Sequence, residues 1–150
     1  WLGQDLAGWR VVDAFAGSGA LGLEAASRGA AQVLLVEHDA GLAAGLGALR
    51  ERLGAEAVRV QRGDGVAVLQ ALAPASVDLV LLDPPFDAQQ LCAPALAAAA
   101  RAVRAGGFVY LEASRRWEPA ELDVHGLVLH RHLKAGAVHA HLFRRPLPGA

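Results

Sequence analysis

Residues that could hold a flat base occur together at Asp83-Pro84-Pro85-Phe86, directly after the apolar run Val77–Leu82. Two prolines fix an extended backbone, so the Asp83 carboxylate and the Pro84 carbonyl can converge on one small donor, and Phe86 offers a ring face. An exocyclic amine is a poor nucleophile because its lone pair is delocalised into the ring. Two fixed acceptors for its hydrogens favour the geometry in which that lone pair can attack a methyl group. The motif therefore indicates methylation of such an amine.

A glycine-rich turn, Gly17–Gly22, has the G-x-G-x-x-G spacing between a predicted strand and a predicted helix. Its glycines let the backbone approach a ligand, either a dinucleotide pyrophosphate or the amino-acid end of S-adenosylmethionine. Asp13, just before the turn, would repel a pyrophosphate but can accept hydrogen bonds from a cationic amino group. This favours S-adenosylmethionine over NAD, while a tight turn without a ligand would use the same glycines.

Two further acids follow the next two predicted strands. Glu37 could hold ribose hydroxyls in either cofactor class, so it does not discriminate between them. Nearby Asp39 is better suited to capping the following helix. Asp64, in the run Gly63-Asp64-Gly65, could reach an adenine edge or cap the next helix, and the two roles can coexist.

These motifs need a scaffold, and strand-length apolar runs alternate with helix-length segments along the chain. That alternation predicts an α/β fold with a mostly parallel, doubly wound sheet, whose ligands bind at the carboxyl ends of the strands. The segment Gly126–Arg145 has no helix stop signal and predicts an antiparallel hairpin turning around Lys134–Ala137. The predicted strands are Arg10–Phe15, Gln32–Glu37, Val58–Arg62, Val77–Leu82 and Phe108–Glu112, preceded by a turn at Arg104–Gly107; the predicted helices are Ala20–Arg28, ended by Gly29, then Ala40–Leu53, Val66–Leu72 and Leu91–Val103.

Composition limits the function classes. The chain has 150 residues, enough for a single domain, and its 54% hydrophobic and 19% charged residues argue against disorder. The net charge of -1 provides no general basic field, so any nucleic-acid contact is local or uses residues outside the chain. A single cysteine, Cys92, excludes an internal disulfide. Without a recognisable secretory signal or a membrane-length apolar run, a cytoplasmic location away from membranes is expected.

Four histidines alternate on the predicted hairpin, at His130, His132, His139 and His141. With a turn at Ala135-Gly136, His132 would face His139 and His130 would face His141 on one side of the ribbon. No carboxylate or thiolate partner stands at an obvious spacing, so we expect a solvated face and no metal. Near pH 6 the four could add positive charge.

Other reactive side chains have simpler structural interpretations. Cys92 lies in a helix with no nearby base, which predicts a packed core cysteine. The run Arg115-Arg116-Trp117 could meet a phosphate and a base, or be an ordinary loop. Arg144-Arg145 is expected at a solvated terminus.

The ordered motifs resemble the bacterial RsmD family, S-adenosylmethionine-dependent methyltransferases that modify a guanine N2 in 16S ribosomal RNA. The resemblance covers nearly the whole chain and is carried by Asp13–Ala25, Glu37, Asp64, Leu82–Phe86 and the turn Lys134–Gly136. It implies a Rossmann-like class I methyltransferase fold, S-adenosylmethionine as cofactor, and a monomer acting on 16S rRNA within a 30S particle or assembly intermediate. Asp-Pro-Pro-Phe alone also occurs in adenine N6 and cytosine N4 methyltransferases of DNA or RNA. Those remain alternatives, as does an NAD(P)-binding oxidoreductase domain.

The resemblance also assigns residues. It implies that Asp13 and the glycine turn line the methionine end of the cofactor, that Glu37 holds the ribose and that Asp64 lies at the adenine. Family members carry a basic N-terminal segment, whereas this chain opens at Trp1-Leu2 as though within a helix, so an N-terminally incomplete protein is expected. The expected cofactor-binding residues are Asp13, Phe15, Ala16, Gly17, Ser18, Gly19, Glu37, His38, Asp64 and Gly65, and the expected catalytic residues are Asp83, Pro84, Pro85 and Phe86.

Overall fold

A seven-stranded sheet forms the centre of the molecule in the computed structural model, which describes residues 2–3 and 5–149. The strand order is β3-β2-β1-β4-β5-β7-β6, in which β1 to β5 are parallel and β7 runs antiparallel to both of its neighbours. The predicted mostly parallel sheet with a C-terminal hairpin is confirmed. The strands are β1 Arg10–Asp13, β2 Gln32–Glu37, β3 Val58–Arg62, β4 Val77–Leu82, β5 Val103–Ala113, β6 Val128–Ala135 and β7 Val138–Arg144.

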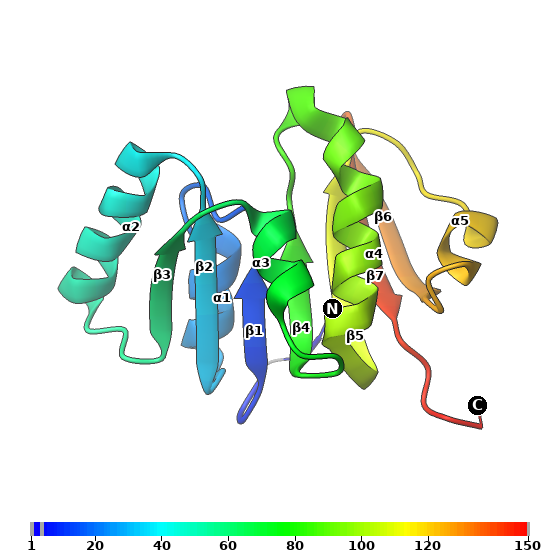
Figure 1. The fold of residues 1–150 in the computed structure, drawn as a ribbon, viewed down its shortest axis with the longest axis horizontal. Coiled ribbons are helices and arrows are strands. Elements are labelled where there is room, and N and C mark those ends of the chain that lie inside the picture. Colours follow the sequence, from blue (N-terminus) through cyan, green and yellow to red (C-terminus); the bar gives the residue numbers. More distant parts are fainter. Residues whose placement is uncertain (1, 4, 150) are drawn as a thin grey trace.

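Helices cover both faces of this sheet (Figure 1). One core lies beneath α1 and α2, where Ala25 and Leu46 pack with Leu35. The other core lies beneath α3, α4 and α5, where Leu69, Leu96 and Leu122 pack. All six residues of β4 are buried, as expected for a central parallel strand covered on both sides. The helices are α1 Ala20–Ser27, α2 Ala40–Leu53, α3 Gly65–Ala71, the 3-10 helix η1 Phe86–Leu91, α4 Cys92–Ala102 and α5 Pro119–Asp123.

Local signals set the ends of the helices. Asp39 caps α2 by accepting a hydrogen bond from Leu42 N at 2.9 Å. Gly29, with φ of 95°, follows the end of α1 as predicted. No helix in the described part of the chain is both long enough and apolar enough to cross a membrane.

Two strand boundaries differ from the prediction. β1 ends at Asp13, not at Phe15, because the chain turns there and Phe15 N donates back to Asp13 Oδ1 at 3.4 Å. β5 begins at Val103, so Arg104–Gly107 is not a turn between elements. Val77 pairs with Val103 but Leu79 pairs with Phe108, so the extra residues form an irregularity inside the strand.

Two short helices were not predicted. η1 follows Asp-Pro-Pro directly, and α5 lies between β5 and the hairpin. For α5 the sequence does contain a signal, because Glu118, Pro119 and Glu121 have the spacing of a helix start. In the structure Glu121 Oε2 accepts from Glu118 N at 2.8 Å. At the start of the chain, Leu2 and Gly3 are not helical, contrary to expectation, and Trp1 lies outside the described residues.

The hairpin forms where predicted, but the predicted register of its two strands is wrong. Ala135 pairs with Val138 across Gly136 and Ala137, so the backbone partner of His132 is His141 and not His139. The His132 and His139 rings are nevertheless in contact as expected, with 2.9 Å between Nε2 and Nδ1. A register shift between Leu129 and Arg131 leaves His130 without a pair in the ladder. His130 therefore does not face His141; its ring lies against Phe108 instead, with 5.7 Å between ring centroids.

Candidate active site

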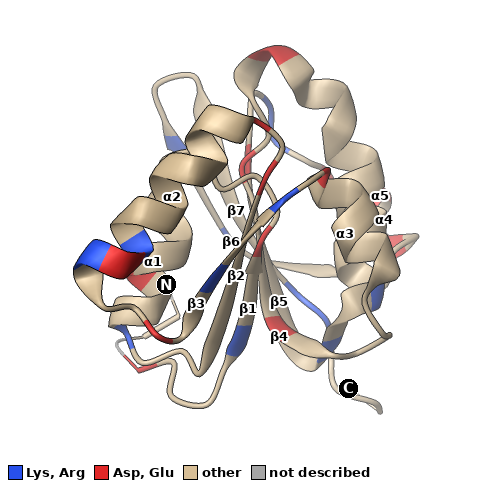
Figure 2. Ribbon diagram, turned by 60° about the vertical axis from the view of Figure 1, so that its left-hand side comes forward, with Lys and Arg blue, Asp and Glu red and all other residues tan. Residues whose placement is uncertain are grey.

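A cavity of about 410 Å³ lies at the carboxyl ends of the central parallel strands. The loops after β1, β2 and β4 form it, so the glycine turn and the Asp-Pro-Pro-Phe motif share one space although they are far apart in the sequence. Figure 2 shows acidic positions gathered around this edge of the sheet. The lining residues are Asp13, Phe15, Ala16, Gly17, Ser18, Ala20, Leu21, Glu37, His38, Leu42, Asp83, Pro84, Pro85 and Phe86.

Asp13 sits at the base of the cavity and is only 1% exposed. Its carboxylate accepts from Phe15 N and, at 3.2 Å, from Gly22 N, so it holds the turn closed. Burial raises the pKa of Asp13 to about 7, although these two hydrogen bonds act in the opposite direction. A cationic group placed beside this carboxylate would favour its ionised form.

The glycine turn is shaped by positive φ angles and close packing. Gly17 has φ of 55° and open space where a Cβ would stand, and Gly19, with φ of 85°, is the N-cap residue of α1. At Gly22 a Cβ would lie 2.2 Å from Leu35 Cδ2, so any larger residue would have to displace the buried Leu35 side chain where α1 meets β2. The turn thus serves packing and also leaves its backbone open to the cavity.

Glu37 links the ends of the first two strands. Its Oε1 accepts from Gly17 N and its Oε2 from Asp39 N, both at 2.9 Å. His38 Nδ1 lies 3.2 Å from Glu37 Oε2, and the His38 side chain is largely exposed at the cavity rim. A carboxylate that is fixed by two amides in this way has a defined orientation toward a ligand's hydroxyl groups.

Asp64 and Gly65 are outside the set that lines the cavity. The Asp64 carboxylate caps α3 by accepting from Val66 N at 2.9 Å and Ala67 N at 3.4 Å, which establishes the capping role that the sequence left open. At Gly65 a Cβ would lie 1.9 Å from the carbonyl oxygen of Ala14, so glycine is needed for α3 to meet the end of β1.

The Asp-Pro-Pro-Phe motif forms the opposite wall of the cavity. Pro84 is buried, whereas Phe86 is 65% exposed and carries its ring at the rim. The pKa of Asp83 is raised to about 6. The main cause is burial, followed by the charge of Glu112 and by a hydrogen bond with Glu112. Glu112 was not singled out from the sequence. The available signal was the alternation in Tyr110-Leu111-Glu112, which places both polar side chains on one face of β5.

The donor set indicates which ligand chemistry fits. Asp13, Glu37 and Asp83 give the cavity three carboxyl groups, and no Lys or Arg is found among its described lining residues. A pyrophosphate would find no cation here, whereas a cationic ligand with hydroxyl groups would find acceptors. The antiparallel β7 between β5 and β6 also departs from the 3-2-1-4-5-6 order of dinucleotide-binding sheets.

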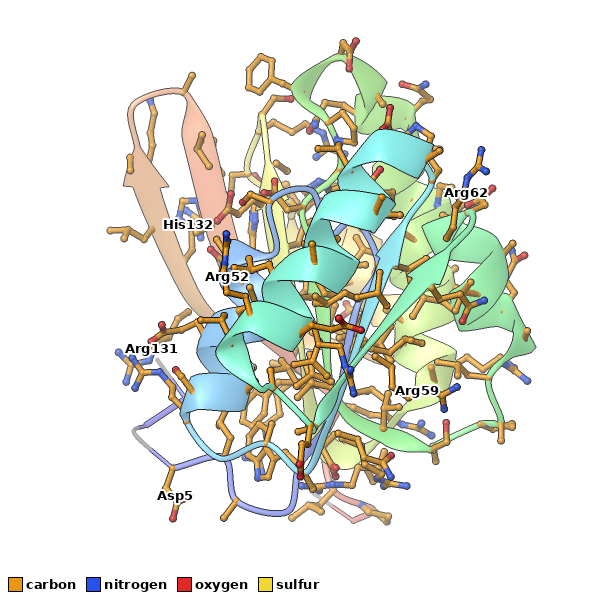
Figure 3. The ribbon with its side chains drawn as sticks, turned by 90° about the vertical axis from the view of Figure 1, so that its left-hand side faces the viewer. Asp5, Arg52, Arg59, Arg62, Arg131 and His132 are labelled. Atoms are coloured by element: carbon orange, nitrogen blue, oxygen red, sulfur yellow. The ribbon has the colours of Figure 1, made fainter. Side chains whose placement is uncertain are left out.

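The four histidines do not form the expected solvated face. His141 is fully buried; its Nε2 accepts from Trp117 N at 3.1 Å, and its Nδ1 lies 3.1 Å from Leu111 O. Burial lowers the pKa of His141 to about 4, so it adds no charge near pH 6. Figure 3 shows His132 on the hairpin. In residues 2–3 and 5–149 no cluster of His, Cys, Asp or Glu has metal-binding geometry.

The remaining side chains have packing roles. Cys92 is buried as predicted, and burial raises the pKa of its thiol. The Trp117 ring is also buried, so it has no free face for a base. Arg115 lies over that ring, 4.2 Å from its centroid, and pairs with Glu121 at 2.8 Å, so this segment favours the ordinary loop interpretation.

Comparison with known proteins gives consistent relatives. The model of the family described as conserved hypothetical protein 95 matches residues 1–144. The structure of yhhF from Escherichia coli, a proposed methyltransferase, has a TM-score of 0.81 and 30% identity over 95% of this chain and 78% of that one. No curated protein matches the sequence.

Two more distant structures agree in fold. A proposed RNA methyltransferase from Pyrococcus horikoshii has a TM-score of 0.75 and 24% identity, over 95% of this chain and 77% of its own. An S-adenosylmethionine-dependent methyltransferase from Mesorhizobium loti has a TM-score of 0.76 and 14% identity, over 94% and 93% of the two chains. The fold is therefore that of the S-adenosylmethionine-dependent methyltransferases.

Proposed function

The chain belongs to the conserved hypothetical protein 95 family, and from that premise we propose that it transfers a methyl group from S-adenosylmethionine to the exocyclic amine of an RNA base. One observation carries this proposal. The glycine turn with its two acids and the Asp-Pro-Pro-Phe motif line the same cavity of about 410 Å³, so a cofactor and a base can meet there.

The chain's own residues would hold the cofactor at the end of the cavity formed by β1 and β2. Asp13 and the open backbone at Gly17 would meet its cationic amino-acid end, and Glu37 would accept from its ribose hydroxyls. Asp64 and Gly65, at the start of α3, are proposed for the adenine. When bound, S-adenosylmethionine would supply an electrophilic methyl group on a positively charged sulfur.

The residues after β4 would hold the base. Phe86 would stack on it, and the Asp83 carboxylate with the Pro84 carbonyl would accept the two hydrogens of the amine. In this geometry the nitrogen lone pair would point toward the methyl group that a bound S-adenosylmethionine supplies. The nitrogen then releases one proton, for which Asp83 is the nearest proposed acceptor.

Guanine N2 of 16S rRNA, in a small-subunit particle or assembly intermediate, is the proposed substrate. It is supported by the motifs that resemble the RsmD family and by the proposed RNA methyltransferase among the structural relatives. The chain is near neutral overall, so shape and stacking at the Phe86 rim carry more of the recognition than a basic field. Adenine N6 and cytosine N4 are the competing targets, because Asp-Pro-Pro-Phe can hold any exocyclic amine.

The first test is ligand binding, measured as the thermal unfolding midpoint with S-adenosylhomocysteine or with NAD. We expect S-adenosylhomocysteine alone to raise the midpoint, because only a ligand that prefers the folded state stabilises it. A rise with NAD alone would refute the cofactor assignment.

The second test is methyl transfer, with labelled S-adenosylmethionine and 30S particles from cells that lack the activity. After digestion of the RNA, mass spectrometry distinguishes N2-methylguanosine from the N6-methyladenosine and N4-methylcytidine alternatives. The proposal expects the first product; either of the others would replace guanine as the substrate while leaving the reaction class in place.

A further inference from the structure

A polar pair from β5 stands beside Asp83. Leu82 of β4 pairs with Leu111 of β5, so Asp83, directly after the end of β4, lies beside Glu112 of β5. Tyr110 Oη donates to Glu112 Oε1 at 2.7 Å, and the Glu112 side chain is in hydrogen-bond contact with that of Asp83. Three side chains thus form a line from the apolar face of the sheet beneath α1 to the cavity.

The chemistry of this contact is unusual because two ionised carboxylates have only acceptors. A hydrogen bond between Asp83 and Glu112 therefore forms only when the pair holds one proton, and it is absent when both carboxylates are ionised. The partial burial of Asp83 and the charge of Glu112 both favour that proton, and they raise the pKa of Asp83 to about 6.

No compensating cation faces the pair in the described part of the cavity lining. Across the space stand Asp13 from β1, Glu37 from β2 and the rim residue His38. The Tyr110 hydroxyl stays neutral, because burial and Glu112 raise its pKa. A proton on Asp83 is thus stabilised by the neighbouring carboxylate, and no ammonium or guanidinium group in the described cavity lining disfavours it.

We propose that Glu112, anchored by Tyr110, is a positioning residue that aims the Asp83 carboxylate at the target amine and makes it basic enough to accept the proton that this amine loses. The inference rests on the proposed function and deepens it. Sequence motifs did not indicate this residue, and a role for Glu112 explains why β5 carries a second acid beside the Asp-Pro-Pro-Phe motif.

The proton can be followed through the step. As the nitrogen bonds the methyl carbon it becomes positively charged, and one of its N–H bonds then breaks, leaving the electron pair on nitrogen. The proton bonds to an oxygen of Asp83, which becomes a carboxylic acid and donates a hydrogen bond to Glu112. Water takes the proton when the product leaves, which restores both carboxylates for the next cycle.

Glu112→Gln is the sharpest test, because it removes the charge and keeps an acceptor for Tyr110. Carboxyl carbons labelled with ¹³C give the titration of Asp83 by NMR in the full chain without RNA. We expect its midpoint to fall by about one pH unit relative to the wild type. Glu51→Gln, an exposed site on α2, makes the same change in net charge and should leave the midpoint unmoved. An equal midpoint in the wild type and in Glu112→Gln overturns the inference.

Activity provides a second readout. The acid limb of the pH profile of kcat should move to lower pH in Glu112→Gln by as much as the NMR midpoint, whereas S-adenosylhomocysteine binding should not change. Tyr110→Phe loosens Glu112 and should move both in the same direction by less; it also decides the question if Glu112→Gln does not fold. A loss of kcat without any shift in the profile would mean a structural role and would overturn the inference.

The two proposals can fail separately. If the Asp83 midpoint moves as expected but the wild-type protein methylates no RNA, the pairing is supported and the proposed function is refuted. If methyl transfer is found but the midpoint does not move, the proposed function holds and the role of Glu112 is refuted.

Discussion

Two aspartates at opposite ends of β4 have opposite surroundings. Asp78, near the strand's start, accepts from Arg10 N at 2.7 Å and from the Arg10 and Arg104 guanidinium groups, which hold its pKa below the ordinary value of 3.8. Asp83, directly after the strand's end, meets the acid Glu112, and its pKa is raised to about 6. One edge of the sheet therefore stabilises its acid, and the other leaves its acid partly unsatisfied for a ligand.

The same contrast extends across the sheet. At the carboxyl edge, the hydrogen-bond partners of Asp13 and Glu37 among the described residues are backbone amides and a rim histidine, and the pKa of Asp13 is raised as well. Groups with perturbed pKa values in a cavity are typical of functional sites, whereas arginine-paired acids are typical of structural ones. The arginine-paired acid and the acid with a raised pKa thus lie at opposite ends of one strand, β4.

The largest effect is expected from Asp83→Asn. Loss of the carboxylate should lower the rate of methyl transfer by about 10³-fold, within the range for a lost general base and acceptor, because the amine loses its orientation and its proton acceptor. Stability should be unchanged or raised, since an amide beside Glu112 relieves the repulsion of two acids. Transfer rate and urea unfolding measure the two sides. Asp87→Asn, an exposed acid in η1, is the control, and an equal loss of rate there would remove the special status of Asp83.

Asp78→Asn should show the reverse behaviour. Replacing this buried, charge-assisted acceptor should lower the free energy of unfolding by about 2 kcal/mol, and the transfer rate of the folded protein should not change. Because the folded-state pKa of Asp78 lies below its unfolded value, its stabilisation is present above pH 4 and is lost as pH falls through the lowered pKa. The difference between wild type and Asp78→Asn in urea should therefore shrink at low pH; a constant difference contradicts the ion-pair explanation.

Asp13 predicts a pH dependence of cofactor binding. A cationic ligand needs the ionised form, and with a pKa of about 7 the affinity for S-adenosylhomocysteine should be about eightfold weaker at pH 6 than at pH 7.5. Calorimetric titration at the two pH values measures this ratio. Asp13→Asn should bind weakly at both, so a ratio that persists in this variant would assign the pH dependence to another group.

The ligand-free protein should show the matching effect on stability. Because the folded-state pKa of Asp13 is raised, its contribution is fully present below the unfolded value of 3.8 and is lost as pH rises through about 7. Asp13 thus destabilises the empty protein at neutral pH, and a bound cation removes that penalty.

The smallest effect is expected at the rim. Phe86→Ala should raise the KM for RNA about tenfold through loss of stacking, with little change in kcat or stability, because the ring is 65% exposed. Leu53→Ala removes an apolar side chain of similar exposure at the far end of α2 and should leave KM unchanged. Equal effects of the two substitutions would show that general surface apolarity, and not the Asp83 edge, attracts the RNA.

The order of elements and most of the cavity lining were predictable from the sequence. Continuous apolar runs identify central strands such as β4, and a motif that directly follows a parallel strand must lie at its carboxyl edge. Asp13, Glu37 and Asp83 each stand at or directly after the end of such a strand, so their proximity was predictable.

Features that depend on pairing between distant segments were not predictable. The His132–His141 register depends on a turn shifted to Gly136-Ala137, and the irregular start of β5 depends on how it meets β4. Glu112 reads as an ordinary strand-end acid until Leu82 is known to pair with Leu111. Sequence patterns report which face a residue takes, whereas the partner across a ladder is set by the fold.

The central position of β1 also bears on how the protein matures. β1 precedes β2 to β7 in the chain, yet it lies between β2 and β4, and the cavity needs residues from Asp13 through Phe86. A ribosome must therefore release the chain through Phe86 before this cavity can form, and the long-range pairing of β1 with β4 is expected to slow folding. Cofactor binding can consequently act as a late signal of correct assembly, because a nascent chain that has not yet paired these strands offers nothing for it to bind.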